Sequence, residues 1–250
     1  MTISKETKVP TIDFCKVELI KSGGAVDEWE SIRSQVVKAL EEYGCFIAIY
    51  DKVSNETREA MFDILKEIFE FPLETKRKNS VMENPSDGYI GQFPHLPLYE
   101  SFCLSDLTKP QNVETFANIF WPHGNPHFFK VYESYIKPLM ELDEMIKRMV
   151  LESLKVEDYL GEILDACNFN SRFSYYKEAP QGKDLGLNNH TDSSFLTIIA
   201  QNSVNGLEVQ TKNGEWIGVN FPPNSFFVLS GDSFMAWTNG RLHSPVHRVT

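Results

Sequence analysis

The sequence predicts an α+β protein in which a mostly helical N-terminal part precedes a β-rich part built as a sandwich or jelly roll. Apolar residues recur every three or four positions over Val26–Tyr43 and again over 128–154, which is the spacing of amphipathic helices. From residue 170 onward, short β-branched and aromatic runs alternate with turn signals such as Asn205-Gly206 and Asn213-Gly214. Several short strands at this spacing are typical of a sandwich or jelly roll.

Local signals in the first half mark further elements. A short apolar strand is expected over 9–14. Gly44 should end the first helix, and the run 45–50 reads as a strand. Ser54 can cap a second helix, which should stop before Pro72. Residues 73–125 show no clear period and contain several prolines, so we expect a long irregular segment that faces the substrate.

The β-rich half should contain seven short strands. We predict them at 170–177, 194–201, 206–210, 215–219, 225–230, 233–237 and 245–250. The chain is then expected to be one structural unit with two regions: a mostly helical region over 1–125, and the long helix plus jelly roll over 126–250.

Composition excludes several classes of partner. The net charge of −11 provides no basic field to attract nucleic acid or an anionic membrane. No run of 18 apolar residues is present, and the N-terminus lacks the apolar core of a secretion signal. The four cysteines are scattered, as expected for free thiols in a reducing compartment. We expect a soluble, cytoplasmic monomer that acts on a small molecule.

His190-Thr191-Asp192 and a histidine near the C-terminal end of the sequence suggest a metal site. Residues two apart on an extended strand point to the same face of a sheet, so His190 and Asp192 can bind one ion together. Two imidazoles and one carboxylate form the facial triad of non-haem Fe(II) oxygenases. His243 and His247 both compete for the third position. The alternative is an exposed His-Asp pair at a strand end without a metal.

The surroundings of this motif resemble one enzyme family. The aromatic stretch Arg172–Tyr176 lies upstream, the segment Gly186–Asp192 leads into the motif, and Asn239–Thr250 closes the sequence. Together they resemble the plant 2-oxoglutarate/Fe(II)-dependent dioxygenases of specialised metabolism, most closely the AOP-type branch. The resemblance runs from Val9 to the last residue. It implies a double-stranded β-helix (jelly-roll) core behind an N-terminal helical extension.

The resemblance also implies roles for individual residues. The iron ligands would be His190, Asp192 and His247, because the family places its third ligand in the segment equivalent to His247-Arg248-Val249. Tyr176 would reach the carboxylate of 2-oxoglutarate, and Ser174 stands where many relatives have an asparagine that contacts this cosubstrate. The family's Arg-x-Ser, which grips the far carboxylate, has no counterpart in this sequence. We therefore expect a jelly roll truncated at its C-terminal end.

Two further sets of residues are candidates with weaker support. Asn188 and Asn189 precede the first ligand and are expected to accept a hydrogen bond from an imidazole N–H. An aromatic-lined pocket suits a mid-sized organic substrate, although aromatic residues more often belong to a core. The candidate substrate-pocket residues are Phe93, Tyr99, Trp121 and Phe195.

The resemblance implies a reaction and its cofactors. Fe(II) would bind 2-oxoglutarate and dioxygen, with ascorbate as reductant, and 2-oxoglutarate would be decarboxylated to succinate. A small plant metabolite would undergo hydroxylation, desaturation, demethylation or ring closure. Two alternatives remain: a truncated or degenerate relative that binds metal or ligand without turnover, and a cupin-like isomerase or binding module. Formation of succinate distinguishes the first hypothesis from both alternatives.

Overall fold

A computed structural model describes residues 8–17, 26–80, 87–178 and 186–250, which divide into two compact units. The first unit comprises Met1–Lys52, Glu141–Gly161 and Asn188–Thr250, and the second comprises Val53–Met140 and Glu162–Leu187. Each unit is thus assembled from segments that are distant in sequence. The division into regions 1–125 and 126–250 stays a prediction.

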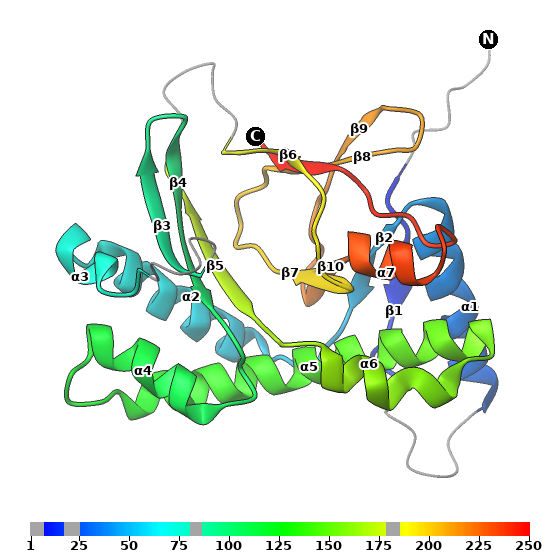
Figure 1. Ribbon diagram of the computed structural model, residues 1–250, viewed down its shortest axis with the longest axis horizontal. Coiled ribbons are helices and arrows are strands. Elements are labelled where there is room, and N and C mark those ends of the chain that lie inside the picture. The colour runs from blue at the N-terminus through cyan, green and yellow to red at the C-terminus, as the bar shows by residue number, and fades with distance from the viewer. Residues whose placement is uncertain (1–7, 18–25, 81–86, 179–185) are drawn as a thin grey trace. The chain divides into compact units, whose positions relative to one another are not determined.

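The first unit contains two four-stranded sheets (Figure 1). One sheet has the order β1 (Thr11–Asp13), β2 (Cys45–Ile49), β10 (Ser225–Ser230) and β7 (Leu196–Ile199). The other has the order β6 (Leu187–His190), β11 (His247–Val249), β8 (Leu207–Gln210) and β9 (Trp216–Gly218). β1 is parallel to β2, whereas β10 is antiparallel to both of its neighbours and β8 is antiparallel to β11 and β9.

Side chains from both sheets form one hydrophobic core. β2 and β10 contribute every second residue, since alternate positions of a strand face the same side. β8 contributes Leu207 and Val209 from the second sheet. The buried members of this cluster are Cys45, Ile47, Leu207, Val209, Val219, Phe227 and Leu229. Their burial is the main source of stability for such a sandwich, at about 25 cal/mol per Å² of apolar surface.

The first unit also contains helices, one of them unexpected. α1 (Val26–Glu42) lies where the apolar period predicts it. α7 (Asp232–Trp237) occupies residues predicted to form a strand, so that prediction was wrong. Four apolar residues, Phe234 to Trp237, follow Asp232, and so short a run fits either element. An aspartate directly after a glycine favours the start of a helix, and this signal favours the helix over the strand here. The unit further includes η1 (Glu157–Tyr159) and the C-terminal part of α5 (Pro126–Leu154).

Gly44 lies where three parts of the first unit meet: the end of α1, the last residue of β10 and the segment before β11 (His247–Val249). Its φ of +74° ends α1 in the left-handed conformation that favours glycine. Its carbonyl accepts a hydrogen bond from the Ser230 N–H at 2.9 Å. A Cβ at this position would lie 2.3 Å from the carbonyl oxygen of His243 and 2.8 Å from Cδ of Pro245. The chain just before β11 therefore rests directly on this glycine.

Replacing Gly44 with alanine should destabilise the protein by roughly 2–4 kcal/mol, because the left-handed conformation and the overlap with His243 both oppose a side chain. Gly214→Ala is the matched control: its φ is +85°, but an added Cβ would have only Gln210 Nε2 in reach, at 4.0 Å. Thermal unfolding of both variants measures the difference. Equal losses of stability would show that the close approach to His243 contributes nothing.

The second unit is built on the antiparallel sheet β3 (Gly88–Phe93), β4 (Leu96–Leu104) and β5 (Ser171–Tyr176) (Figure 1). Its other elements are α2 (Asn55–Glu70), α3 (Leu73–Arg77), α4 (Pro110–Phe120), the N-terminal part of α5 and most of α6 (Leu160–Ala166). The Ser54 hydroxyl accepts a hydrogen bond from the Thr57 N–H, as predicted for the cap of α2.

The prediction of an irregular segment over 73–125 was wrong. Two helices and a β-hairpin occupy most of it. The hairpin is hard to recognise because the register shifts between Gly91 and Phe93, where Gln92 has a φ of +61°. This bulge breaks the alternation of apolar and polar residues that marks a strand. Pro97 is tolerated because it lies close to the start of β4.

The two faces of this sheet differ in character. Phe102 on β4 contacts the rings of Phe69, Phe116 and Phe120, so one face packs on helices through phenylalanines. The opposite face carries tyrosine and serine. On it, Tyr99 is paired in register with Tyr176, and Ser101 is paired with Ser174. The second face therefore presents hydroxyl groups, whereas Glu100 lies on the first face, two positions from Phe102.

A buried carboxylate ties the second unit together. Glu100 on β4 is 3% exposed and accepts four hydrogen bonds. Lys76 Nζ and Tyr89 Oη donate to Oε2 at 2.5 and 3.0 Å, and Lys177 Nζ and Gln92 Nε2 donate to Oε1 at 2.8 and 3.2 Å. Burial alone would raise the pKa of Glu100. Hydrogen bonds from Lys177 and Lys76 outweigh burial and hold this pKa below its ordinary value.

Two further findings bear on the class of protein. Within the described residues, no helix is long and apolar enough to cross a membrane. Cys15, Cys45, Cys103 and Cys167 are all free thiols. Burial raises the pKa of Cys45 to about 12, so this thiol stays protonated and unreactive.

Candidate metal centre

His190, Asp192 and His247 come together in the first unit. His190 is the last residue of β6, Asp192 follows two positions later, and His247 is the first residue of the neighbouring strand β11. Their candidate ligand atoms all lie within 4.8 Å of one another. Both Nε2 atoms lie near Oδ1 of Asp192, at 3.6 Å from His190 and 3.7 Å from His247.

Backbone carbonyls fix the orientation of both imidazoles. Nδ1 of His190 lies 2.8 Å from the carbonyl oxygen of Asn188, and Nδ1 of His247 lies 3.3 Å from that of Pro245. A carbonyl can only accept, so each Nδ1 carries the proton and donates it. Nε2 is then the ring atom of each histidine that is available to a metal ion, and both Nε2 atoms lie near Oδ1 of Asp192. The predicted help from Asn188 thus comes from its backbone carbonyl.

Burial keeps His247 neutral. His247 is only 4% exposed, and burial lowers the pKa of its imidazole below the ordinary value. The nearby His190 lowers the pKa further, while Asp192 opposes the shift only in part. A neutral imidazole is the form that binds a metal ion. No proton therefore has to leave His247 at neutral pH before a metal can bind.

The donor set fits a first-row metal ion. Two neutral imidazoles and one carboxylate suit Fe(II) and related ions, and three protein ligands leave coordination positions for other molecules. Among the described residues, this is the one group of three or more His, Cys, Asp or Glu side chains that converges in this way. The site is partly open, since His190 and Asp192 are half-buried whereas His247 is buried.

The structure distinguishes the two C-terminal histidines geometrically. His243 is half-buried and does not belong to the converging group. Its backbone N–H donates to the carbonyl of Leu40 at 3.0 Å, and its pKa is lowered by burial and by Lys212. His243 thus lies on the end of α1, and His247 is the histidine that approaches Asp192.

Residues at the start of α7 support the ligands, and the sequence did not reveal them. The Asp232 carboxylate accepts a hydrogen bond from the Thr191 hydroxyl at 2.9 Å, and the Asp232 N–H donates to the Asp192 carbonyl at 2.7 Å. A Cβ at Gly231 would lie 2.1 Å from the carbonyl oxygen of Ser194. The pair Gly231-Asp232 could have indicated the start of this helix in the sequence, but it adjoins residues 233–237, which were predicted to form a strand.

The candidate cosubstrate residues lie in the second unit. Tyr176 and Ser174 share the hydroxyl-bearing face of the sheet with Tyr99, whose hydroxyl is 3.5 Å from the Ser174 hydroxyl. The rings of Tyr99 and Tyr176 are 5.3 Å apart. Burial raises the pKa of Tyr176, with a further contribution from Tyr99, so its hydroxyl stays protonated and able to donate.

The candidate substrate residues have different surroundings. Tyr99 is buried against Tyr176, whereas Phe93 is 42% exposed and its ring lies 5.4 Å from that of His95. Trp121 packs with other aromatic rings and donates through Nε1 to Glu67 at 2.9 Å. Phe195 is half-buried, with its ring 5.3 Å from Phe234. The structure thus brings Tyr99 to the cosubstrate candidates and gives the others separate packing contacts.

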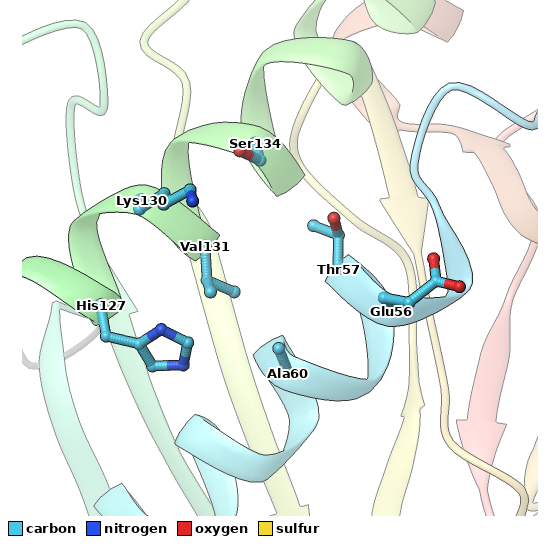
Figure 2. Close-up of a pocket in the computed structure, with 7 residues that line it drawn as sticks. All are labelled: Glu56, Thr57, Ala60, His127, Lys130, Val131 and Ser134. Atoms are coloured by element: carbon cyan, nitrogen blue, oxygen red, sulfur yellow. The ribbon is translucent and has the colours of Figure 1, made fainter.

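A small groove in the second unit involves none of these residues. It lies between the N-terminal parts of α2 and α5 and has a volume of about 200 Å³ (Figure 2). Its lining residues are Glu56, Thr57, Ala60, His127, Lys130, Val131 and Ser134. Glu56, His127, Lys130 and Ser134 are exposed. The groove is a surface feature between two helices, and its side chains do not converge on one point as the metal ligands do.

Two domain families match the chain. The 2OG-Fe(II) oxygenase superfamily domain matches residues 166–250, and the N-terminal domain described as non-haem dioxygenase in morphine synthesis matches residues 9–123. The probable 2-oxoglutarate-dependent dioxygenase AOP1.2 of Arabidopsis thaliana is 39% identical over 97% of this chain and 75% of its own length. A probable inactive 2-oxoglutarate-dependent dioxygenase AOP2 of the same plant is 30% identical, over 89% of this chain and 76% of its own length.

Solved structures share the fold. The dioxygenase for auxin oxidation 1 of Arabidopsis thaliana, in complex with 2-oxoglutarate, superposes with a TM-score of 0.84. It is 28% identical, and the match covers 97% of this chain and 86% of that one. The T7H protein of Neurospora crassa, 21% identical over 97% of this chain and 78% of its own, has a TM-score of 0.80. The predicted α+β fold with a double-stranded β-helix core is thereby confirmed.

Proposed function

We propose that this chain, which belongs to the 2-oxoglutarate/Fe(II)-dependent oxygenase superfamily, oxidises a small plant specialised metabolite and binds its iron through His190, Asp192 and His247. Its cofactor is Fe(II), and 2-oxoglutarate is its cosubstrate. The convergence of three donor atoms, with both imidazoles fixed at Nδ1, carries the assignment of the ligands.

The protein's own contribution is to bind and orient. When bound, Fe(II) supplies the redox chemistry by which 2-oxoglutarate and dioxygen become succinate and carbon dioxide while the substrate is oxidised. His190 and His247 would present their Nε2 atoms to the ion, and Asp192 would supply a carboxylate whose negative charge balances part of the metal's charge. Hydroxylation, desaturation, demethylation and ring closure are the proposed outcomes. Ascorbate as reductant and a cytoplasmic location stay predictions.

An anaerobic titration tests the proposal. The purified chain is titrated first with Fe(II) and then with 2-oxoglutarate, and the weak visible charge-transfer band of the chelated complex is followed. A saturable band, with succinate formed after oxygen is admitted, supports the proposed function. Iron binding without the band or succinate favours the alternative of a relative that binds without turnover, a possibility raised by the probable inactive AOP2. A chain that does not bind iron would overturn the ligand assignment.

We further propose, on the resemblance alone, that Tyr176 and Ser174 contact 2-oxoglutarate. Tyr176→Phe should then raise the KM for 2-oxoglutarate about tenfold or more, since a hydrogen bond to a charged group contributes about 1.5–3 kcal/mol. Steady-state kinetics with varied 2-oxoglutarate measure the effect. Tyr175→Phe is the control, because Tyr175 is 42% exposed and its ring stacks on Phe69. Equal KM values for the two variants would remove Tyr176 from the site.

A further inference from the structure

The segment that follows His190 and carries Asp192 is held by the start of α7. This ligand segment, Thr191–Phe195, accepts hydrogen bonds from three consecutive residues. The Gly231 N–H donates to Phe195 O at 3.0 Å, the Asp232 N–H to Asp192 O at 2.7 Å, and the Ser233 hydroxyl to Ser193 O at 2.5 Å. The segment therefore has little freedom to move relative to α7.

Of these three donor residues, Asp232 makes a second contact with the ligand segment. Asp232 also accepts a hydrogen bond from the Thr191 hydroxyl at 2.9 Å. The Asp232 N–H thus binds the carbonyl of Asp192, and the Asp232 carboxylate binds the hydroxyl of Thr191, the residue between His190 and Asp192 in the sequence. A hydrogen bond to an ionised carboxylate is shorter and stronger than one between neutral groups.

α7 is in turn fixed to the sheet of β1, β2, β10 and β7. Its start follows β10 directly, and β10 pairs with both β2 and β7. Gly231 is buried, and a Cβ there would lie 2.1 Å from Ser194 O and 2.8 Å from Asp192 O, so the backbones approach closely. A ligand that is held by a rigid neighbour keeps its geometry before the metal arrives, which raises affinity.

We propose that Asp232 is a positioning residue that acts through Thr191 and the Asp192 backbone to preset the iron site. The proposal rests on the ligand assignment made above. Asp232 touches neither substrate nor metal in this role. Its contribution is measured by how tightly the protein binds Fe(II).

The test compares Fe(II) affinities of variants that change only side-chain atoms. Thr191→Val removes the hydroxyl with little change of shape, and Asp232→Ala removes its acceptor while the backbone N–H remains. Each should weaken Fe(II) binding about 10- to 100-fold, the usual effect of losing a partner of a metal ligand. The double variant should be no weaker than the weaker single one, because both remove one interaction. Thr191→Ser, which keeps the hydroxyl, should bind nearly as the parent does.

Thr197→Val is the matched control. It removes a side-chain hydrogen bond of the same length, 2.9 Å to the hydroxyl of Ser194, which also belongs to the ligand segment, and it leaves the Thr191–Asp232 hydrogen bond in place. Affinities are measured by anaerobic calorimetry with Fe(II) alone, and metal-free thermal unfolding is recorded for every variant. Weaker binding in Thr191→Val and Asp232→Ala, restored in Thr191→Ser and absent in Thr197→Val, supports the proposal.

The failures of the two proposals are distinguishable. If the parent chain binds Fe(II) and Asp192→Ala does not, while Thr191→Val and Asp232→Ala bind as tightly as the parent, the positioning role of Asp232 is wrong and the ligands stand. If the control Thr197→Val loses as much affinity as Thr191→Val, the effect is general loosening and the proposal is overturned. If the parent itself binds no Fe(II), the ligand assignment falls and the positioning role with it.

Discussion

Asp192→Ala is expected to abolish Fe(II)-dependent succinate formation. Loss of a partner of a metal ligand usually weakens metal binding 10- to 100-fold, so loss of a ligand should cost more than about 100-fold. Asp192 is also the one negatively charged group of the triad, and its Oδ1 lies near both imidazoles. Without it, two neutral nitrogens would have to hold the ion alone. His190→Ala should fail in the same way.

The two C-terminal histidines provide the control. His247→Ala should lose Fe(II) binding, whereas His243→Ala should keep it, because His243 lies outside the converging group. Anaerobic calorimetry with Fe(II), followed by a succinate assay under oxygen, gives both readouts. Activity near that of the parent in Asp192→Ala, or equal losses in the two histidine variants, would sink the assignment.

Glu100→Gln is expected to destabilise the protein by about 3–5 kcal/mol, the usual cost of removing one partner of a buried ion pair. The glutamine side chain would have nearly the shape of the native one but would take from Lys76, which is 7% exposed, the negative partner it has among the described residues. Three further donors, from Tyr89, Gln92 and Lys177, would lose a charged acceptor. Urea unfolding of the parent and the variant measures the difference.

The pH dependence of this loss has a defined sign. Hydrogen bonds from the lysines hold the pKa of Glu100 below its ordinary value, so its stabilising effect is present above the unfolded pKa and disappears as the pH falls through the folded one. The gap in stability between parent and variant should therefore begin to narrow below about pH 4 and should close only below the lowered pKa of Glu100 in the folded protein. Glu133→Gln is the control, since both partners of the Glu133–Lys137 pair are more than half exposed and such pairs contribute about 0–1 kcal/mol. A constant gap between parent and Glu100→Gln down to acid pH would contradict the role given to the carboxylate.

Local signals made much of the fold predictable. The period of apolar residues placed α1, Ser54 placed the start of α2, and Gly44 placed the end of α1. The strands over 170–177 and 225–230 were also found, because their β-branched and aromatic runs are bounded by turn residues. Each of these signals lies within a few residues of its effect, which is why sequence alone carries it.

Contacts between residues that are distant in the sequence could not be predicted from it. Asp232 meets Thr191, and Glu100 meets Lys76, only because the folded chain brings separate elements together. The hairpin of β3 and β4 was missed because its bulge hides the strand period, and α7 because four apolar residues fit a strand as well as a helix turn. Residue type and spacing suggested His190 and Asp192, and the family resemblance suggested His247, whereas the support from Asp232 was not predicted.

The interleaving of the two units has a consequence for the order of folding during synthesis. β2 lies between β1 and β10, yet β10 begins only at Ser225, after the whole second unit has been made. The central strand β2 must therefore wait, with one edge unpaired, until translation has passed Ser230. Pairings between such distant segments form slowly, and unpaired strand edges invite association with other chains. The N-terminal strands are thus exposed to such association while translation continues.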